Sequence, residues 1–259
     1  MQNKTLLVRM PDGTWAQPLY GHPSSHIIKR SPDRYPDLVD AEHDALTVAR
    51  HAGLTMVNSW VDTIAGHRCI IVERFDRTVD DGGQITGRIH QEDACQALGL
   101  PASRKYEVHH GGGGPDFQSV ARLLDLYAAE PVSQLERLAS IAAFTVITGN
   151  ADAHGKNIAF LLEAGVIRLA PLYDTVPTAL FAPLRTEMAM TLGGAISPDG
   201  MDLAALVRET KRWNLDPARA RAAATRTAEL ALDAVDQALI DPDGPLAEQI
   251  RRKATEFMD

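Results

Sequence analysis

The period of the apolar pattern changes near residue 90, and this change limits the folds that the chain can adopt. Before it, TLLVRM (5–10) and HIIK (26–29) are short runs typical of strands, and only residues 37–54 repeat apolar side chains at helical spacing. The runs MVNSWVDTIA and HRCIIVERFD meet at Gly66 and predict a hairpin. From residue 91 onward helical spacing dominates. This order predicts an α+β fold with a small β-rich lobe, a larger and mainly α-helical lobe, and a cleft between them.

The second part of the chain contains one interruption of its helical pattern. QEDACQALGL, DFQSVARLLDLYAAE, VSQLERLASIAAFTVITG and the Ala-rich residues after 200 carry helical periodicity. Between them, NIAFLLEAG and VIRLAPLYD predict a short hairpin that turns at Ala164 and Gly165. Because the loop VDDGG (79–83) separates the two parts, we divide the chain into lobes of residues 1–78 and residues 79–259.

Charge and apolar content argue against several classes of protein. A formal net charge of −8 argues against a chain that binds nucleic acid by itself, because such proteins present a basic surface. No run reaches the ~18 consecutive apolar residues of a membrane span, and MQNKTLLVRMPDG lacks the features of a secretory signal. Two cysteines, Cys69 and Cys95, are too few for a disulfide framework. We therefore expect a cytoplasmic protein with reduced cysteines and no membrane contact.

A polar loop lies between two apolar segments in ITGNADAHGKNIAFL (147–161). Asn157 follows Asp152 by five positions, and Asp174 follows 17 positions later, at the end of the predicted hairpin. One carboxylate can accept the proton of an attacking hydroxyl, while amide and carboxylate oxygens suit Mg²⁺ bound to phosphate. Protein kinases carry their phosphoryl-transfer residues in this order: a catalytic Asp, an Asn five residues later, and then a metal-binding Asp. A solvated loop with local turn bonds is the alternative interpretation.

Residues upstream of this loop favour phosphoryl transfer. HIIK ends in Lys29, and the next predicted helix contains Glu42. A kinase needs a strand lysine that holds the nucleotide phosphates and a helix glutamate that pairs with this lysine. The segment IIVERFD (70–76) ends the small lobe where backbone groups could bind a nucleotide base. These features predict a nucleotide site in the cleft.

Six stretches resemble the HipA family of bacterial Ser/Thr kinases, the toxins of HipA–HipB toxin–antitoxin systems. They are SHIIKR, VDAEHDALTVARHAGL, VERFDR, QEDACQALGLPASRKYE, GNADAHGKN and LAPLYDTVPT, which occur in family order over residues 25–178, and the downstream EMAMTLGG is similar too. The GLP-x-x-x-KYE segment has no general role in kinases, so it ties the resemblance to this family. The resemblance implies a two-lobed protein-kinase-like fold and a Ser/Thr protein kinase that uses ATP and Mg²⁺.

The resemblance also implies roles for individual residues. Asp152 is the expected catalytic base, and Asn157 and Asp174 are the expected Mg²⁺ ligands. Lys29 is similar to the phosphate-holding lysine, and Glu42 to its partner. The expected nucleotide-binding positions are Lys29, Glu42, the hinge residues Glu73, Arg74 and Phe75, and then His154, Lys156, Asn157, Tyr173 and Asp174.

Partners follow from the same resemblance. The expected protein substrate is an aminoacyl-tRNA synthetase, in particular one like glutamyl-tRNA synthetase. The expected binding partner is a HipB-like helix-turn-helix antitoxin, and the chain would contact DNA only indirectly, through this antitoxin.

The N-terminus departs from the family pattern. Gln2 and Lys4 in MQNKTLLVRM are similar to the tail of the family's glycine-rich loop, while the serine and glycine of that loop and the small subdomain before it have no counterpart. We therefore expect a fragment, a naturally short form, or a chain whose start was assigned too late. A second glycine run, HHGGGGPDF (109–117), lacks the Gly-Lys-Ser/Thr of a Walker-type loop, and we interpret it as a flexible connection.

Two other functions remain open at the level of sequence. Small-molecule kinases of the aminoglycoside-phosphotransferase type use a similar Asp-to-Asn loop, but they usually carry His two residues before the Asp, where this chain has Asn150. The second alternative is an inactive kinase-like scaffold that binds a partner, because the chain lacks most of the glycine-rich loop.

Overall fold

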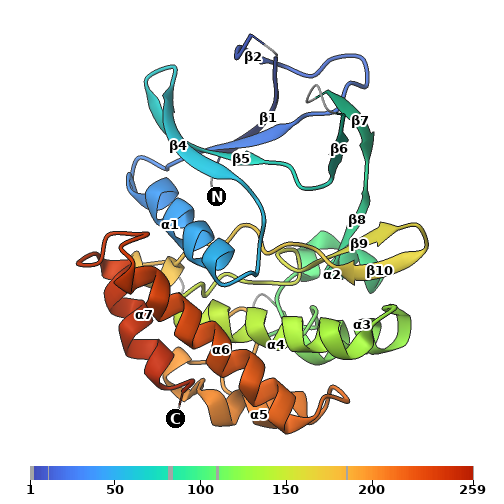
Figure 1. The fold of residues 1–259 in the computed structure, drawn as a ribbon, viewed down its shortest axis with the longest axis vertical. Coiled ribbons are helices and arrows are strands. Elements are labelled where there is room, and N and C mark those ends of the chain that lie inside the picture. The colour runs from blue at the N-terminus through green and yellow to red at the C-terminus, as the bar shows by residue number, and fades with distance from the viewer. Residues whose placement is uncertain (1–2, 11, 81–83, 109–110, 185, 259) are drawn as a thin grey trace.

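The computed structural model describes residues 3–10, 12–80, 84–108, 111–184 and 186–258. A small β-rich lobe lies above a larger, mainly helical lobe (Figure 1). The predicted α+β architecture with two lobes is therefore confirmed. The predicted division after residue 78 falls inside β6 (Arg77–Val79), and this boundary stays a prediction.

The small lobe is built on an antiparallel sheet of five strands in the order β2-β1-β3-β5-β4. The predicted hairpin at Gly66 is confirmed, because Ile64 pairs with His67 and both turn residues, Ala65 and Gly66, have positive φ, as tight hairpin turns require. The strands are β1 (Asn3–Arg9), β2 (Trp15–Ala16), β3 (His26–Arg30), β4 (Ser59–Ile64) and β5 (His67–Glu73).

Helix α1 (Leu38–His51) connects the cores of the two lobes, and it confirms the helix predicted over residues 37–54. On one side, Val39 and Leu46 belong to a small-lobe cluster with Ile70. On another side, Ala45, Val48 and Ala49 belong to the main core of the large lobe. Figure 1 shows α1 between the sheet and the helices below. The lobes therefore share one helix.

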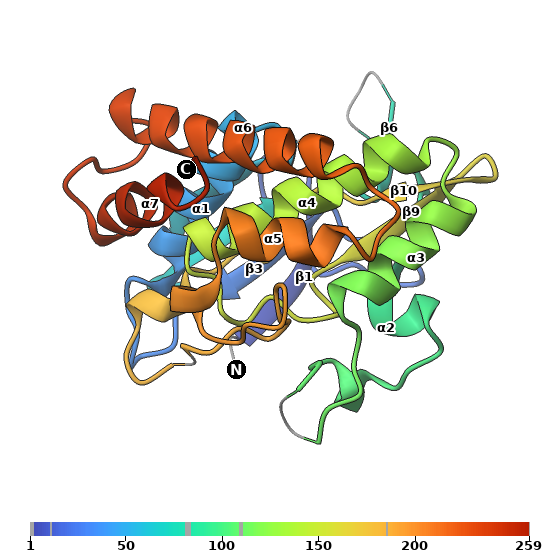
Figure 2. The same ribbon diagram turned by 90° about the horizontal axis from the view of Figure 1, so that it is seen from below.

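Helix α4 (Pro131–Ile147) is the centre of the large lobe (Figure 2). It is apolar on nearly all sides over its second half, where Leu138, Phe144 and Ile147 are fully buried, as expected for a helix surrounded by others. Its neighbours are α3 (Phe117–Tyr127), α5 (Leu203–Thr210), α6 (Pro217–Asp236) and α7 (Pro245–Thr255). Single 3-10 turns occur at Ala102–Arg104, Thr178–Leu180 and Pro198–Gly200.

The prediction of a helix over QEDACQALGL was wrong for its first residues. They form strand β8 (His90–Asp93), and only α2 (Ala94–Ala97) is helical. The reason is that Asp93 and Gln96 form a capping box, which starts the helix after Asp93, while β8 pairs with β9 (Ala159–Glu163).

The hairpin predicted at Ala164 and Gly165 is confirmed by the pairing of β9 with β10 (Val166–Leu169). β8 adds to it as a third strand. A further hairpin, β6 with β7 (Ile85–Arg88), was not predicted. The loop predicted over residues 79–83 lies mostly in residues 81–83, outside the described residues.

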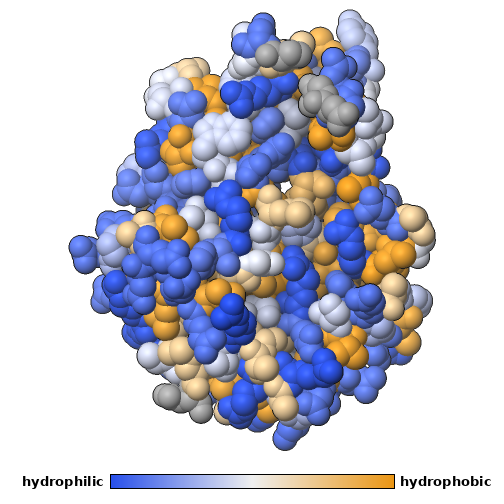
Figure 3. Space-filling view, in the orientation of Figure 1, coloured by the Kyte–Doolittle hydropathy of each residue, from blue (hydrophilic) through white to orange (hydrophobic). Residues whose placement is uncertain are grey.

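The surface of the molecule is mixed in character. In Figure 3, polar side chains cover much of both lobes, and apolar side chains gather on the flank formed by β9 and β10. Among the helices that the structure describes, none combines the length and the apolar character needed to cross a membrane.

Asp44 on α1 provides a prediction about stability. Burial, and then the nearby Asp40 and Asp241, raise the pKa of Asp44 to about 6. The folded chain therefore keeps this proton at pH values where the unfolded chain has lost it, so stability falls as pH rises from about 4 to about 6. We expect Asp44→Asn to raise the free energy of unfolding at pH 7.5 by about 1 kcal/mol, after allowance for solvent screening.

Urea unfolding at pH 7.5 and pH 4 checks this expectation. The gain of the Asp44 variant should disappear at the lower pH, because wild-type Asp44 is then protonated as well. Asp199→Asn, at an exposed site, is the control. An equal gain at both pH values would contradict the argument.

Candidate active site

Lys29 lies in the cleft, on the middle strand of the small-lobe sheet. It pairs in register with Lys4 of β1 and Ile70 of β5, and it is 5% exposed. Its ammonium group donates to Asp174 Oδ1 at 2.5 Å and also to Glu42 of α1. Strand β3 and helix α1 thus bring Lys29 and Glu42 together, and Asp174 joins them from the large lobe.

The charges of this group determine which members are ionised. Burial by itself would lower the pKa of Lys29, but the carboxylates of Asp174 and Glu42 outweigh burial and raise that pKa. The charge of Lys29 lowers the pKa of Asp174 to about 2. Burial raises the pKa of Glu42 in spite of Lys29, and Glu42 Oε2 has no hydrogen-bond partner in the described part of the chain. Lys29 and Asp174 are therefore the firm ion pair at neutral pH.

Asp174 has a backbone conformation that is uncommon outside glycine. Its φ of 55° lies in the left-handed region, which aspartate adopts more readily than branched residues do. Strand β10 ends at Leu169, so Asp174 lies beyond the strand whose end it was predicted to occupy. Asn157 Nδ2 donates to Asp174 Oδ2 at 3.0 Å, and Asn157 Oδ1 accepts from the N–H of His154 at 3.1 Å. The two predicted metal ligands are therefore in direct contact.

Asp152 is half-buried in the loop that follows α4. Its Oδ1 accepts a hydrogen bond of 2.8 Å from the hydroxyl of Tyr106. The preceding residue, Ala151, donates from its N–H to Thr178 Oγ1 at 3.0 Å, and its carbonyl accepts from the N–H of Ala189 at 2.9 Å. The loop therefore presents the carboxylate of Asp152 from a fixed backbone.

His154 is buried, and its pKa responds to the predicted base, Asp152, and to the predicted metal ligand Asp174. Burial lowers its pKa, which Asp152 and Asp174 act to raise and Lys105 acts to lower. Lys105 Nζ lies 2.6 Å from His154 Nε2. Because an ammonium group can only donate, Nε2 accepts and the ring proton is on Nδ1, which has no partner among the described residues.

A cavity of about 130 Å³ opens next to Lys29, between the small-lobe sheet and the segment that carries Asp174. Its walls include the aromatic rings of Phe75 and Tyr173, whose centroids are 5.6 Å apart. The cavity therefore has an apolar part and a charged part. Its lining residues are Lys4, Ile27, Lys29, Val72, Glu73, Arg74, Phe75, Asp76, Gln91, Tyr173 and Asp174.

The predicted hinge residues form one wall of this cavity. The N–H of Glu73 donates to the carbonyl of Asn58 and that of Arg74 to the carbonyl of Ser25, each at 2.9 Å. Asp76 holds the guanidinium group of Arg74 with bonds of 2.9 and 2.6 Å. The N–H of Phe75 has no hydrogen-bond partner among the described residues.

Lys156 does not line the cavity. Its ammonium group donates to Asp93, the residue that caps α2, at 2.6 Å. Its carbonyl accepts from the hydroxyl of Tyr173 at 2.7 Å, and burial raises the pKa of this hydroxyl. Lys156 thus touches the site through its backbone, which fixes the ring next to Asp174.

Several side chains at the site were not among the residues predicted to bind the nucleotide or to act in catalysis. Lys4, Asp76 and Gln91 line the cavity, and Tyr106 contacts Asp152. Sequence patterns gave no reason to select Asp76 and Gln91, because each becomes relevant only through the folding of β5 and β8 around the cavity. Tyr106 could have been selected from the sequence, because it is the tyrosine of the family-specific KYE motif.

Oxygen atoms of Asp174 and Asn157 could bind a hard cation. Asp174 is ionised, and an amide oxygen is a common second ligand for such ions. Within the described residues no cluster of three or more His, Cys, Asp or Glu could hold a metal by itself. Mg²⁺ usually takes one or two carboxylates and completes its shell with water and phosphate oxygens, so the ligand types of the pair suit this ion. In this structure the amide nitrogen of Asn157 faces Asp174, and its amide oxygen, which would have to bind the ion, accepts from the N–H of His154.

Comparison with known families gives a match over most of the chain. The model of the family described as HipA-like C-terminal domain matches residues 1–237. Y4mE of Sinorhizobium fredii is 37% identical over 201 residues, which are 78% of this chain and 47% of Y4mE. The serine/threonine-protein kinase toxin HipA of Shewanella oneidensis is 32% identical over 185 residues, 69% of this chain and 42% of that protein. The chain spans about half the length of these curated relatives.

Solved structures agree with this match. The complex of HipA, HipB and operator DNA from Shewanella oneidensis contains a chain of TM-score 0.83 and 26% identity, with 99% of this chain and 62% of that chain covered. The Helicobacter pylori proinflammatory kinase CtkA has a TM-score of 0.54 at 12% identity, with 98% of this chain and 94% of that chain covered. The second likeness concerns the fold alone. Together they confirm the predicted kinase-like fold.

Proposed function

Since this chain belongs to the HipA-like C-terminal domain family, we propose that it is a serine/threonine protein kinase that transfers the γ-phosphoryl group of ATP to a protein. The main support for this proposal is that Lys29 forms ion pairs with Glu42 and Asp174 beside a cavity of about 130 Å³. A strand lysine paired with a helix glutamate, next to an aspartate after a hairpin, is the arrangement that kinases use to hold ATP.

The cavity supports ATP as the phosphoryl donor. The rings of Phe75 and Tyr173 supply flat apolar surface for a base, and the free N–H of Phe75 supplies a hydrogen-bond donor. Lys29, at the charged part of the cavity, supplies a cation for the phosphate oxygens. A small apolar site that ends in charged groups suits an adenine base joined to phosphates.

Transfer requires a group that takes the proton of the acceptor. In the proposed step the acceptor oxygen forms a bond to the γ-phosphorus, the bond from that phosphorus to the β,γ-bridging oxygen breaks, and ADP leaves. Asp152 accepts the hydroxyl proton. Asp174 and Asn157 would hold Mg²⁺, which neutralises phosphate charge when bound.

The proposed partners rest on the relatives alone. HipA of Shewanella oneidensis is named a serine/threonine-protein kinase toxin, and its solved complex contains HipB and operator DNA. By analogy we propose a HipB-like antitoxin as the binding partner of this chain, and DNA contact only through that antitoxin. We further propose an aminoacyl-tRNA synthetase, such as glutamyl-tRNA synthetase, as the substrate, and the cytoplasm as the place of action.

Calorimetric binding of Mg·ATP to this chain and to Asp174→Ala tests the nucleotide site. We expect the wild-type chain to bind and the variant to lose at least about tenfold in affinity, a difference of about 1.4 kcal/mol. The reason is that Asp174 is the ionised carboxylate beside Lys29. Asp199→Ala, an exposed control, should bind like wild type. Equal binding by wild type and Asp174→Ala, or none by wild type, would refute the proposed site.

A further inference from the structure

Residues 105–107 contact two residues of the loop that carries Asp152 and one residue outside it, Thr191, and we call them the bracing segment. Lys105 Nζ lies 2.6 Å from His154 Nε2, and the hydroxyl of Tyr106 donates to Asp152 at 2.8 Å. On the other side of Tyr106, Glu107 binds Thr191. These residues are the KYE of the motif that has no general role in kinases, so the contacts give the motif a physical meaning.

Backbone hydrogen bonds hold the bracing segment against the loop that carries Asp152. The carbonyl of Lys105 accepts from the N–H of Gly155 at 2.9 Å, three residues after Asp152. The N–H of Glu107 donates to the carbonyl of Ala189 at 3.3 Å, and Ala189 is itself bonded to Ala151, the residue before Asp152. The segment is thus linked to the loop on both sides of the predicted base.

The glycine run after the bracing segment packs directly against it. The N–H groups of Gly113 and Gly114 donate to the carbonyls of Glu107 and Tyr106, at 2.9 and 3.0 Å. A Cβ atom on Gly114 would lie 2.4 Å from the carbonyl oxygen of Tyr106, far inside contact distance. The run that the sequence presents as a connection therefore supports the backbone of Tyr106.

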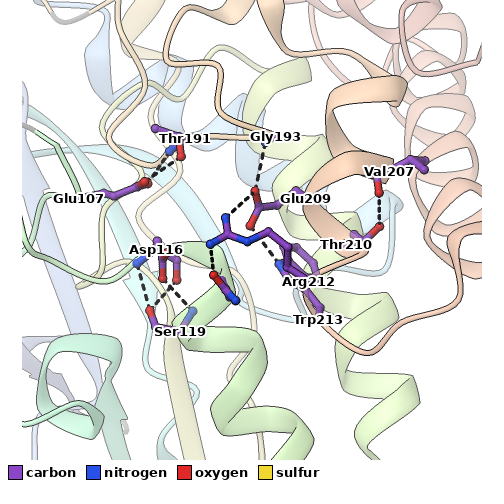
Figure 4. Close-up of polar contacts among 11 residues, drawn as sticks. Glu107, Asp116, Ser119, Thr191, Gly193, Val207, Glu209, Thr210, Arg212 and Trp213 are labelled. Carbon is purple, nitrogen blue, oxygen red and sulfur yellow. Dashed lines mark hydrogen bonds and ion pairs between the residues drawn. The ribbon is translucent and has the colours of Figure 1, made fainter.

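Glu107 anchors the far end of the bracing segment (Figure 4). Its carboxylate accepts from the N–H of Thr191 at 2.6 Å and from the hydroxyl of the same residue at 2.7 Å. Burial raises the pKa of Glu107, and these two bonds oppose the rise. Figure 4 also shows Glu209 bound to Gly193, which fixes the segment after Thr191. Both ends of the bracing segment therefore make hydrogen bonds to other segments: Lys105 to His154, and Glu107 to Thr191.

The side chain of Tyr106 is held as firmly as its backbone. Its ring meets the ring of His154 edge-on, with centroids 5.2 Å apart. The ammonium group of Lys105 lies 4.9 Å from the ring centre, a favourable cation–π distance. Tyr106 contacts the predicted base, and it is not among the residues that line the cavity next to Lys29.

We propose that Tyr106 is a positioning residue for Asp152. Its hydroxyl binds Oδ1, which fixes the rotation of the carboxylate and leaves Oδ2 for the acceptor hydroxyl. The role rests on the proposed phosphoryl transfer, in which Asp152 takes the acceptor proton as the new oxygen–phosphorus bond forms and ADP leaves. Tyr106 itself gains and loses no proton in this step.

Kinetics of Tyr106→Phe form the first part of the test, with Tyr127→Phe as the matched control because Tyr127 is exposed on α3. Transfer from labelled Mg·ATP is measured with casein and the chain itself as acceptors. We expect kcat to fall about 10- to 100-fold, since loss of orientation by about 1 Å has effects of this size. The KM for ATP should change less than about twofold, because the Tyr106 hydroxyl contacts Asp152, whose proposed role is in the step after ATP binding. A fall no larger than that of the control, or a change in KM alone, overturns the proposal.

Urea unfolding of Tyr106→Phe, Asp152→Ala and the double variant forms the second part, and it needs no activity. Tyr106→Phe should lower the ratio of folded to unfolded chain about tenfold when Asp152 is present, and by a clearly smaller factor when Asp152 is absent. Equal effects in both backgrounds overturn the inference. If Tyr106→Phe destabilises the chain more when Asp152 is present, but the wild-type chain transfers no phosphate, then the contact between Tyr106 and Asp152 is supported. The proposed kinase function is then refuted.

Discussion

Asp152→Asn is expected to reduce phosphoryl transfer by about 10³-fold and to leave the binding of Mg·ATP within about twofold. A general base contributes about 10² to 10⁴ in rate, and an amide cannot take the acceptor proton. The fold should survive, because the amide oxygen of asparagine can still accept from Tyr106, as the carboxylate does at 2.8 Å. Initial rates with labelled ATP, together with calorimetry, measure the two effects separately.

The pattern of losses distinguishes Asp152 from Asp174. Asp174→Ala should weaken nucleotide binding, whereas Asp152→Asn should affect only the step after binding. Asp62→Asn, on the exposed part of β4, is a control of the same chemical change. Transfer at the wild-type rate by Asp152→Asn would show that another group takes the proton, and the assignment of the base would then be wrong.

Lys29→Met is expected to lower the free energy of unfolding by about 3 kcal/mol and to abolish the binding of Mg·ATP. Glu42 is fully buried, and Lys29 is its ionic partner. Removal of one member of a buried ion pair leaves an unpaired charge, which typically costs about 3 to 5 kcal/mol. Methionine keeps most of the apolar stem, so loss of the cation is the main change.

The stability of Lys29→Met should also depend on pH. Burial already raises the pKa of Glu42, and loss of Lys29 raises it further. The folded variant then keeps a proton that the unfolded chain releases, so its stability falls as pH rises. We therefore expect a larger deficit at pH 8 than at pH 5, measured by urea unfolding against wild type.

A second substitution separates stability from function. Replacement of both members of a buried pair by apolar residues is often neutral. Lys29→Met with Glu42→Leu should therefore recover the part of the lost stability that comes from Glu42, while Asp174, the other partner of Lys29, stays without its cation. Binding of Mg·ATP should stay absent, because the double variant has no cation at this position. Recovery of binding would mean that Lys29 does not hold the phosphates.

Local pattern was sufficient to predict the elements that carry the site. The helix over residues 37–54 and the hairpin at Ala164 and Gly165 have the periodicity and turn residues of their kind, and both formed as expected. The order of Asp152, Asn157 and Asp174 indicated one site, and the structure places Asn157 against Asp174 at 3.0 Å. These residues are near enough in sequence for a loop and a hairpin to join them.

Contacts between distant segments could not be predicted in this way. Asp93 starts a helix and ends a strand, and the choice between them at residues 90–93 depended on pairing with β9. Tyr106 reaches Asp152 across 46 positions of sequence. No local spacing rule records such a contact, because it depends on how the glycine run and the loop after α4 pack. The contact between Lys156 and Asp93 likewise joins segments that are distant in sequence, so no local spacing rule predicts it.

The helix shared by the two lobes has a consequence for how the chain is made. The small-lobe side of α1 can pack as soon as β5 is complete, but its other side packs on α6, where His51 meets Asp233, 182 positions later. At about 5 to 20 residues per second, ribosomes need roughly ten to forty seconds to add that length. For this interval the side of α1 that packs on α6 lacks this neighbour. The nascent small lobe therefore lacks part of the final cover of α1 until α6 has been synthesised.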